Sequence, residues 1–192
     1  MSRPAIFLDR DGTVSEEVGY VNHVSRYRLL HRGAEAIRRI NESDYLAVLV
    51  TNQAGVARGY FKEALIREVH GRLEELLAEG EARLDGIYYC PHHPTAGEPP
   101  YRQDCRCRKP KPGMIEAAAR DLGIDVARSV VVGDKHSDIV FAHSLGMKGV
   151  LVRTGYGAGE IEQWSAEWTE HPDWVAGDLL DAVEWILEGT KG

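Results

Sequence analysis

The segment AIFLDRDGT, residues 5–13, decides the fold prediction, because four apolar residues run directly into two aspartates and a glycine. An uninterrupted apolar run of this length indicates a strand buried on both faces, as in parallel sheets. Asp9 and Asp11 follow its carboxyl end, and a spacing of two in extended chain points both side chains the same way. Gly12 then allows a tight turn. The segment therefore predicts a buried strand with two carboxylates side by side at its carboxyl end.

The alternation of apolar strands with helical patterns continues along the chain. Further strands are predicted at 46–50, 86–89, 129–132 and 149–152, and helices at 34–40, 62–79, 114–122, 137–145 and 179–187. Three stretches are predicted to be irregular, at 12–28, 91–112 and 154–173. Strands that alternate with helices are typical of a parallel sheet covered on both faces. We therefore predict a doubly wound, Rossmann-like α/β fold.

Length and composition limit the class of protein. The chain has 192 residues, 43% hydrophobic and 28% charged, which suits one domain over residues 1–192 with its own core. A formal net charge of −7 provides no broad basic surface for nucleic acid or an anionic membrane. No segment has the pattern of a membrane span or a signal peptide, and the few cysteines fit a reducing compartment. We expect a cytoplasmic monomer without nucleic-acid or membrane partners.

Polar side chains also follow the other predicted strands. Ligands of such sheets bind beyond the carboxyl ends of the strands, so these residues are the candidates for a site. Residues 51–53, Thr-Asn-Gln, can donate hydrogen bonds to phosphate oxygens. Asp134 adds a third carboxylate. Together with Asp9 and Asp11 it can hold Mg²⁺, which prefers oxygen ligands and retains water and substrate phosphate.

Arg108 and Lys109 supply the positive charge that a transferring phosphoryl group needs, since its negative charge spreads over three equatorial oxygens. Each feature taken alone has an ordinary explanation. An Asp-x-Asp pair often caps a helix or solvates a turn, and a single lysine is usually a solvated surface charge. The convergence of these residues on one sheet edge predicts phosphoryl-transfer chemistry.

The three cysteines lie in one loop, at about residues 90–107, with two histidines between the first and second of them. Four side chains of this loop are of the kind that builds tetrahedral structural zinc sites: Cys90, His92, Cys105 and Cys107. Extended geometry sends His92 to the side of Cys90, and His93 is the alternate ligand. Reduced thiols beside solvated histidines are the other interpretation. We predict a structural zinc site that fixes the basic pair after the loop.

Four motifs, in this order, resemble those of the haloacid dehalogenase (HAD) superfamily. They are Asp9-Arg10-Asp11-Gly12-Thr13-Val14, Val50-Thr51-Asn52, Lys109 and Gly133-Asp134-Lys135-His136-Ser137-Asp138. The resemblance implies that Asp9 is the nucleophile and Asp11 the general acid/base, while Thr51 and Lys109 stabilise the phosphoryl group. It also implies that Mg²⁺ is held by Asp9, the backbone carbonyl of Asp11 and Asp134. An aspartyl-phosphate would form on Asp9, and water activated by Asp11 would hydrolyse it.

The zinc loop narrows the resemblance. Cys-x-His with Cys-x-Cys-Arg-Lys-Pro, together with TNQAGVARGYF at 51–61, resembles the group of heptose 1,7-bisphosphate phosphatases and histidinol-phosphatases. The resemblance implies substrate contacts by Glu17, Val18, Gly19, Tyr20, Asn52, Gln53, Ala54, Arg108 and Lys135. This sequence departs at Ala54, where serine is common, and at His31-Arg32, where a proline often precedes the glycine. Too little chain separates the motifs for a cap domain, so we expect an open, capless site.

The leading functional hypothesis is removal of the 7-phosphate from D-glycero-D-manno-heptose 1,7-bisphosphate, a small phosphorylated sugar used for lipopolysaccharide core or surface-layer glycans. Histidinol-phosphate phosphatase has identical chemistry and is the first alternative. A non-enzymatic, zinc-stabilised module that binds phosphorylated ligands is the alternative of another class, and the intact aspartate pair argues against it. A phosphomutase would need a cap to retain its intermediate.

Some features remain open at this level. The sequence does not fix the anomer preference or the role of the tail after Thr154. Asp138 has three candidate roles: it orders the water shell of the metal, holds Lys135, or occupies the first turn of the next helix. We interpret His136 as a solvent-facing loop residue, with a contact to substrate as the alternative. Trp164 and Trp168, one helical turn apart, are interpreted as a packing pair.

Overall fold

A six-stranded parallel sheet organises the chain in the computed structural model, which describes residues 2–189. The strands are β1 (Ala5–Leu8), β2 (Leu46–Asn52), β3 (Gly86–Cys90), β4 (Val130–Gly133), β5 (Lys148–Val152) and β6 (Trp174–Ala176). Their order is β3-β2-β1-β4-β5-β6, and every neighbouring pair is parallel. β1 lies between β2 and β4, so the residues that follow it emerge near the middle of the sheet edge.

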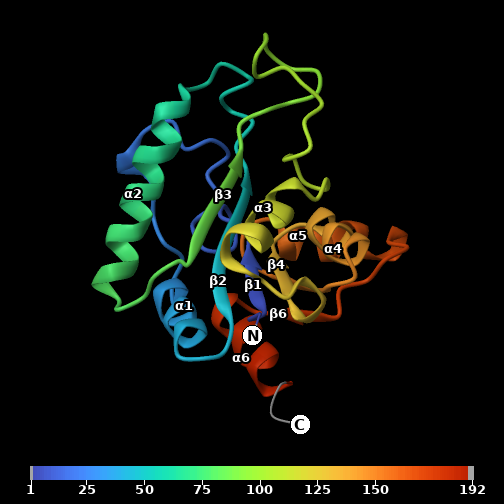
Figure 1. Ribbon diagram of the computed structural model, residues 1–192. Helices are drawn as coiled ribbons and strands as arrows, with labels where there is room; N and C mark the ends of the chain where they lie inside the picture. The colour runs from blue at the N-terminus through green and yellow to red at the C-terminus, as the bar shows by residue number, and fades with distance from the viewer. Residues whose placement is uncertain (1, 190–192) are drawn as a thin grey trace.

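Helices cover both faces of this sheet (Figure 1). They are α1 (Gly33–Asn41), α2 (Glu63–Glu79), α3 (Gly113–Leu122), α4 (His136–Ser144), α5 (Gly157–Trp164) and α6 (Leu179–Glu188). Short 3₁₀ turns occupy Val24–Arg26, Val126–Arg128 and Ser165–Glu167. The predicted doubly wound α/β fold is confirmed.

The central strand is buried on both sides, as its apolar run predicts. All four residues of β1 are fully inaccessible to solvent. Ile6 and Leu8 pack into the core shared with α1, α2 and α6, whereas Ala5 and Phe7 pack into the core shared with α3 and α4. Burial of each large apolar side chain contributes about 1.5–3 kcal/mol, so the strand that carries Asp9 is firmly anchored.

Two helix ends follow the expected chemistry. Gly123 ends α3 in the left-handed region at φ 67°, where glycine has no steric penalty. The carboxylate of Asp178 accepts a hydrogen bond from the backbone N–H of Asp181 and caps α6. The Asp178 side chain thus satisfies one of the backbone N–H groups that the first turn of a helix leaves unpaired.

The prediction of an irregular stretch at 154–173 is wrong. This stretch contains α5 and a 3₁₀ turn, and β6 follows at Trp174–Ala176. Helix α5 begins Gly157-Ala158-Gly159, and glycine has a low helix propensity, which hides the helix. The three residues of β6 are too few to show a strand pattern, and the strand lies at the sheet edge.

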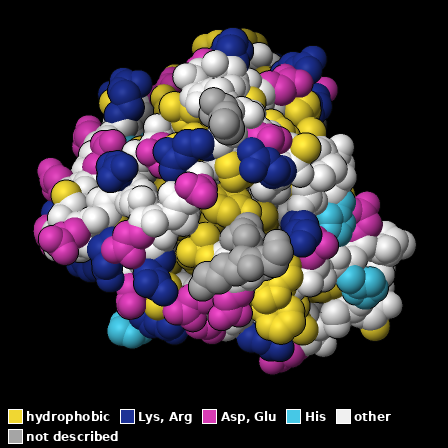
Figure 2. Space-filling model, turned by 60° about the horizontal axis from the view of Figure 1, so that its bottom comes forward, with side chains coloured by type: hydrophobic (Ala, Val, Ile, Leu, Met, Phe, Trp, Pro, Cys, Tyr) yellow, Lys and Arg dark blue, Asp and Glu magenta, His cyan; other side chains and the backbone are white. Residues whose placement is uncertain are grey.

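A large hollow lies at the amino end of the sheet, away from the residues that follow the carboxyl ends of the strands. Its volume is about 1350 Å³, and Pro4, Tyr45, Ser129, Lys148 and Trp185 are among its lining residues. Figure 2 shows apolar side chains at this end of the molecule, surrounded by acidic and basic ones. Among residues 2–189, no helix has the length and apolar character to cross a membrane.

Candidate active site

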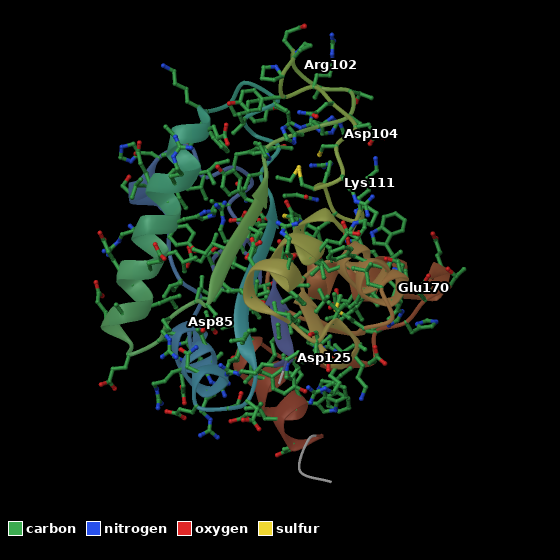
Figure 3. All side chains as sticks on the ribbon, in the orientation of Figure 1. Asp85, Arg102, Asp104, Lys111, Asp125 and Glu170 are labelled. Carbon is green, nitrogen blue, oxygen red and sulfur yellow. The ribbon has the colours of Figure 1, made fainter. Side chains whose placement is uncertain are left out.

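Residues that follow β1, β2 and β4 converge at the carboxyl edge of the sheet with the loop that precedes α3. In Figure 3, Asp85 and Asp125 mark the opposite, amino edge, whereas Arg102, Asp104 and Lys111 mark the loop above the carboxyl edge. The predicted site residues therefore meet where ligands of open α/β sheets bind.

Lys109 joins two aspartates from different elements. Its Nζ lies 2.8 Å from Oδ1 of Asp9 and 2.8 Å from Oδ1 of Asp138, and all three side chains are buried. Burial acts to lower the pKa of Lys109, but the charges of Asp138 and Asp9 outweigh it and raise that pKa. The lysine therefore stays charged beside the predicted nucleophile.

One of the three candidate roles of Asp138 is to hold Lys135. The structure shows that Asp138 forms its ion pair with Lys109. It lies in the first turn of α4, and its side chain points back against the end of β4. A Cβ on Gly133 would lie 2.3 Å from Oδ2 of Asp138, so only glycine leaves room for this contact. Burial raises the pKa of Asp138, and the charge of Lys109 opposes that rise.

Asp134 is the strongest candidate for a cation ligand. It is fully buried, and its Oδ2 accepts a hydrogen bond from the backbone N–H of Tyr156 at 2.9 Å. Oδ1 of Asp134 and Oδ2 of Asp138 are buried without a hydrogen-bond partner among the described residues. Burial, reinforced by the charge of Asp9 and opposed by that of Lys135, raises the pKa of Asp134 to about 7. A divalent cation would satisfy these oxygens and favour ionised carboxylates.

Three carboxylates form one group here. Asp9, Asp134 and Asp138 each place an oxygen within 4.8 Å of the others. Hard oxygen donors of this number and charge fit Mg²⁺. The sequence predicts Asp9, Asp11 and Asp134 as cation ligands. In the structure Asp138 belongs to the group, and the carboxylate of Asp11 does not. A role for the Asp11 backbone carbonyl remains a prediction.

The loop after β5 forms a wall of the site that the sequence analysis missed. The hydroxyl of Thr154 donates to the carbonyl of Gly12 at 2.6 Å, and Tyr156 holds Asp134 as described. Gly155 packs against Asp134 so closely that a Cβ there would lie 2.3 Å from its Oδ2. The rule that polar residues after strands form the site, applied to this fifth strand, identifies Thr154.

Asp11 takes different partners from Asp9. β1 ends at Leu8 and the chain bends at Arg10, so the extended geometry assumed for the aspartate pair does not hold. Oδ2 of Asp11 accepts from Nη2 of Arg10 and from Nε2 of Gln53, both at 2.9 Å. Gln53 also donates to the hydroxyl oxygen of Thr51 at 3.0 Å. The end of β2 thus supports the predicted acid/base.

The side chain of Asn52, which is predicted to contact substrate, pairs with the backbone of Lys109. Its Nδ2 donates to the Lys109 carbonyl at 3.1 Å, and its Oδ1 accepts from the Lys109 N–H at 3.0 Å. This two-way pairing fixes the height of Lys109 above the sheet. Ala54 lies beside this region with its carbonyl accepting from the N–H of Arg58.

The predicted substrate loop lies over one side of the site. Oε1 of Glu17 accepts from the N–H of Gly19, and Oε2 lies 3.7 Å from Nζ of Lys135. That Nζ lies 4.6 Å from the ring centre of Tyr156, a cation–π distance. A pocket of about 470 Å³ is lined by Glu16, Glu17, Gly19, Leu30, Gly155 and Tyr156.

Two other members of this loop differ in exposure. Val18 packs partly into the core. Tyr20 is 40% exposed and meets the ring of Tyr60 edge-on, with centres 4.6 Å apart. Tyr20 is therefore the loop member whose ring is free to meet an outside molecule.

The four predicted zinc ligands come together. Each offers one ligand atom, and these atoms lie within 4.8 Å of one another: Cys90, His92, Cys105 and Cys107. Sγ of Cys107 lies 3.1 Å from that of Cys90 and 3.4 Å from Nδ1 of His92. Burial raises the pKa of the Cys90 thiol. Three thiols and an imidazole at these spacings are a donor set that fits zinc.

The side chain of His93 does not belong to the cysteine cluster, unlike that of His92. Its Nε2 lies 3.1 Å from Nη2 of Arg58, and its Nδ1 accepts from the N–H groups of Thr95 and Ala96. The choice of His92 over His93 agrees with this arrangement.

The loop is tied to the site at both ends. Nη1 of Arg108 donates to the carbonyl of His92 at 3.2 Å. Glu63, at the start of α2, accepts from the hydroxyls of Tyr89 and Tyr101 at 2.9 and 2.7 Å. The cysteine loop therefore connects α2 to the segment that carries Lys109.

Two interpretations from the sequence, one of His136 and one of the pair Trp164 and Trp168, are wrong. His136 is the first residue of α4, and its ring stacks on Trp168 with centres 4.5 Å apart, while Nε2 lies 2.8 Å from the carbonyl of Glu170. It is not a solvent-facing loop residue. Trp168 packs on His136 and not on Trp164, which is 51% exposed. Contacts between segments more than 30 residues apart override the helical spacing.

Comparisons with known proteins agree with this geometry. A profile of the HAD-hydrolase-like family matches residues 106–182. The chain is 43% identical over 190 residues to a D-glycero-D-manno-heptose-1,7-bisphosphate 7-phosphatase of Thermosynechococcus vestitus, covering 97% of this chain and 96% of the relative. It is 42% identical over 188 residues to a D-glycero-beta-D-manno-heptose-1,7-bisphosphate 7-phosphatase of Haemophilus ducreyi, covering 97% and 100%.

A solved structure is similar over the same length. The D,D-heptose 1,7-bisphosphate phosphatase of B. bronchiseptica, complexed with magnesium and phosphate, superposes with a TM-score of 0.84 at 33% identity. The match covers 97% of this chain and 99% of that one.

Proposed function

This chain belongs to the D-glycero-D-manno-heptose-1,7-bisphosphate 7-phosphatase family of HAD-like hydrolases, and we propose that it removes the 7-phosphate from that sugar bisphosphate. The observation that carries the proposal is the position of Asp9. Its carboxylate lies beside the buried Lys109 and within one group with Asp134 and Asp138, whose orphaned oxygens suit a divalent cation. A nucleophile, a fixed positive charge and a cation site are the parts that phosphoryl transfer needs.

The proposed reaction has two steps. An oxygen of Asp9 attacks phosphorus, the bond from phosphorus to the heptose oxygen breaks, and Asp11 donates a proton to that leaving oxygen. Asp11 then takes a proton from water, which attacks the aspartyl-phosphate and releases inorganic phosphate and the Asp9 carboxylate. Lys109 and the hydroxyl of Thr51 stabilise the charge that develops on the phosphoryl oxygens.

Mg²⁺ is the cation that this site and its magnesium-bound relative support. Asp9, Asp134 and the backbone carbonyl of Asp11 are the proposed ligands, with Asp138 beside them. When bound, the cation neutralises repulsion between the anionic nucleophile and the anionic phosphate.

Zinc is proposed as a structural ion in the cysteine loop. Cys90, His92, Cys105 and Cys107 are its ligands, and its role is to hold the segment that carries Arg108 and Lys109. The close approach of three thiols, together with the absence of His93 from the cluster, supports this assignment.

Substrate recognition is proposed for the residues that surround the site. Glu17, Gly19, Tyr20 and Lys135 lie on one side, and Arg108 lies on the other, near the zinc loop. The backbone of Val18 and residues 53–54 complete the proposed substrate-binding surface. Asn52 contributes by holding the backbone of Lys109. We further propose that the enzyme is a cytoplasmic monomer, which gel filtration with light scattering tests for the oligomeric state.

Histidinol phosphate is the competing substrate, because the same chemistry serves both. The deciding experiment compares kcat/KM for the α and β anomers of heptose 1,7-bisphosphate and for histidinol phosphate, at saturating Mg²⁺. We expect one heptose anomer to exceed histidinol phosphate by at least about 100-fold, since a site that pairs polar groups of one substrate rejects another that leaves them unpaired. A higher value for histidinol phosphate would overturn the substrate assignment.

A further inference from the structure

Arg10 stands between the two proposed catalytic aspartates, yet its side chain is only 2% exposed. A buried charge is strongly disfavoured unless it is paired. Its Nε and Nη2 donate to Oδ1 and Oδ2 of Asp11, at 3.1 and 2.9 Å. Because both ends of the guanidinium fork are used, this pair fixes the plane as well as the position of the carboxylate.

The remaining nitrogen of Arg10 has a partner on another element. Its Nη1 lies 3.4 Å from Nε2 of His70, a buried residue of α2. Burial and the charge of Arg10 lower the pKa of His70 to about 3, so the ring is neutral and Nε2 accepts from the guanidinium. The ring of His70 in turn meets that of Tyr89 edge-on, with centres 5.6 Å apart.

The hydrogen bonds leave one acceptor site on Asp11 for a reacting proton. An ionised carboxylate has about four acceptor sites, two on each oxygen. On Oδ2, Arg10 and Gln53 use both. On Oδ1, Arg10 uses one, and the hydroxyl of Ser15 is 3.5 Å away, at the limit of a hydrogen bond. Oδ1 is thus the oxygen free to hold the proton.

We propose that Arg10 is a positioning residue for the acid/base Asp11, and that His70 holds Arg10 in the orientation which this requires. The inference rests on the proposed role of Asp11. It adds a chain of contacts from α2 through Arg10 to Oδ1 of Asp11, and neither Arg10 nor His70 needs to touch the substrate.

A leaving-group comparison separates positioning of the acid from a general loss of structure. A heptose alkoxide is a poor leaving group and needs the proton from Asp11, whereas the nitrophenolate of 4-nitrophenyl phosphate leaves readily without it. kcat/KM reports events up to cleavage of the bond from phosphorus to the leaving oxygen. Misplacement of Asp11 therefore lowers kcat/KM for the sugar phosphate selectively.

The experiment measures kcat/KM for both substrates in wild type and in Asp11→Asn, Arg10→Gln, His70→Leu and His70→Gln, with Arg3→Gln as the control. Arg3 is exposed and binds backbone carbonyls near Tyr45, far from the site. For Arg10→Gln we expect a loss of about 100-fold with the heptose bisphosphate and less than about 10-fold with the aryl phosphate. His70→Leu is expected to show a smaller loss of kcat/KM with the same preference for the heptose bisphosphate. In His70→Gln, kcat/KM for the heptose bisphosphate returns toward the wild-type value, because an amide oxygen replaces Nε2 as acceptor.

Equal losses on both substrates, or no loss, would overturn the proposal for Arg10. Circular dichroism and thermal unfolding establish that each variant is folded. If Arg10→Gln does not fold, the two His70 variants provide the test. Equal kcat/KM of His70→Leu and His70→Gln for the heptose bisphosphate would contradict a role of His70 in orienting Arg10. If Asp11→Asn itself shows no leaving-group selectivity, the acid role of Asp11 fails, and that result concerns the proposed function instead.

Discussion

At the scale of single residues, the site depends on glycines that make room for Asp134. Gly12 and Gly155 have φ values of +81° and +56°, in the left-handed region that side chains rarely adopt. A Cβ at these positions would lie 2.1 and 2.3 Å from Oδ2 of Asp134. These glycines therefore set the position of the proposed cation ligand.

Gly155→Ala is expected to displace the Asp134 carboxylate. We expect the Mg²⁺ concentration for half-maximal activity to rise at least about 10-fold, because a ligand shifted by a fraction of an ångström no longer completes the site. Titration of activity with Mg²⁺ measures this change.

The matched control is Gly123→Ala. Gly123 also has a positive φ, +67°, but a Cβ there would meet nothing within 4 Å. Both variants carry the conformational cost of about 1 kcal/mol or more, which thermal unfolding measures. An unchanged Mg²⁺ requirement in Gly155→Ala would show that Gly155 does not position Asp134.

His70 gives a pH dependence of stability. Its pKa falls to about 3 in the fold, against 6.5 for an unperturbed ring. Below about pH 6.5 His70 is protonated in the unfolded chain but stays neutral in the folded protein. The free energy of unfolding therefore decreases as the pH falls from about 6.5 toward about 3. Between about pH 7 and pH 5 we expect wild type to lose about 1–2 kcal/mol more than His70→Gln in urea unfolding. Equal losses in the two proteins would mean that His70 protonates freely in the fold.

The sequence predicts many of the residues that converge on the site, but not their partners. Asp9 and Asp134 are readable because each follows a buried strand, and Lys109 because its motif resembles a known one. Asp138 and Arg10 are not readable in their actual roles. Their partners depend on how α4 and α2 pack, and local spacing contains no information about a contact such as Arg10 with His70, 60 residues apart.

At the scale of elements, the cysteine loop joins α2 to the segment before α3. Figure 1 shows this loop rising beyond the carboxyl end of β3, outside the layered part of the fold. Glu63 holds it through Tyr101, and Asn52 holds the Lys109 segment to β2. The loop contains no helix or strand of its own, so the proposed zinc ion would supply a cross-link that secondary structure does not.

We expect His92→Ala to lose zinc and His93→Ala to keep it. Metal analysis of the purified variants measures bound zinc, and thermal unfolding measures the loss of stability that follows when a structural ion is removed. In His92→Ala, activity falls with the metal because the segment with Lys109 is no longer fixed. Full zinc content in His92→Ala, or its loss in His93→Ala, would contradict the assigned ligands.

Most of the elements predicted from sequence have either an uninterrupted apolar run or a clear helical pattern. β1, β2 and β4 are apolar runs and α2 is a long amphipathic helix, so their patterns are unambiguous. α5 and β6 are not predicted because two glycines weaken one pattern and the other has only three residues. Both are stabilised by packing onto the finished sheet, which no local pattern records.

At the scale of the whole molecule, the strands belong to one sheet with a core on each face. We propose, as the composition predicts, that the chain is one domain. Its thermal unfolding is then expected to be one cooperative transition, with equal calorimetric and van't Hoff enthalpies in the zinc-loaded protein. Two separated transitions, or a calorimetric enthalpy well above the van't Hoff value, would contradict a single domain.

The two ends of the sheet differ in chemistry. The larger hollow at the amino end has mixed charges on its rim (Figure 2), whereas the carboxyl end concentrates Asp9, Asp134, Asp138 and Lys109 in a small buried group. Size alone would have pointed to the wrong end. The convergence of strand ends, which the sequence already predicts, identifies the catalytic one.

The proposed mechanism requires that heptose 1,7-bisphosphate phosphorylates Asp9 covalently. The most direct measurement is acid quenching during turnover, followed by mass spectrometry of the peptide that contains residues 5–13. Wild type is quenched with the heptose bisphosphate, and Asp11→Asn with 4-nitrophenyl phosphate, because nitrophenolate leaves without an acid while loss of the base slows hydrolysis of the intermediate. We predict an acid-stable, hydroxylamine-labile phosphoryl group on Asp9 that is absent from Asp9→Asn, which does not turn over. Phosphate release by Asp9→Asn at the wild-type rate, with no label on the wild-type peptide, would contradict the covalent mechanism.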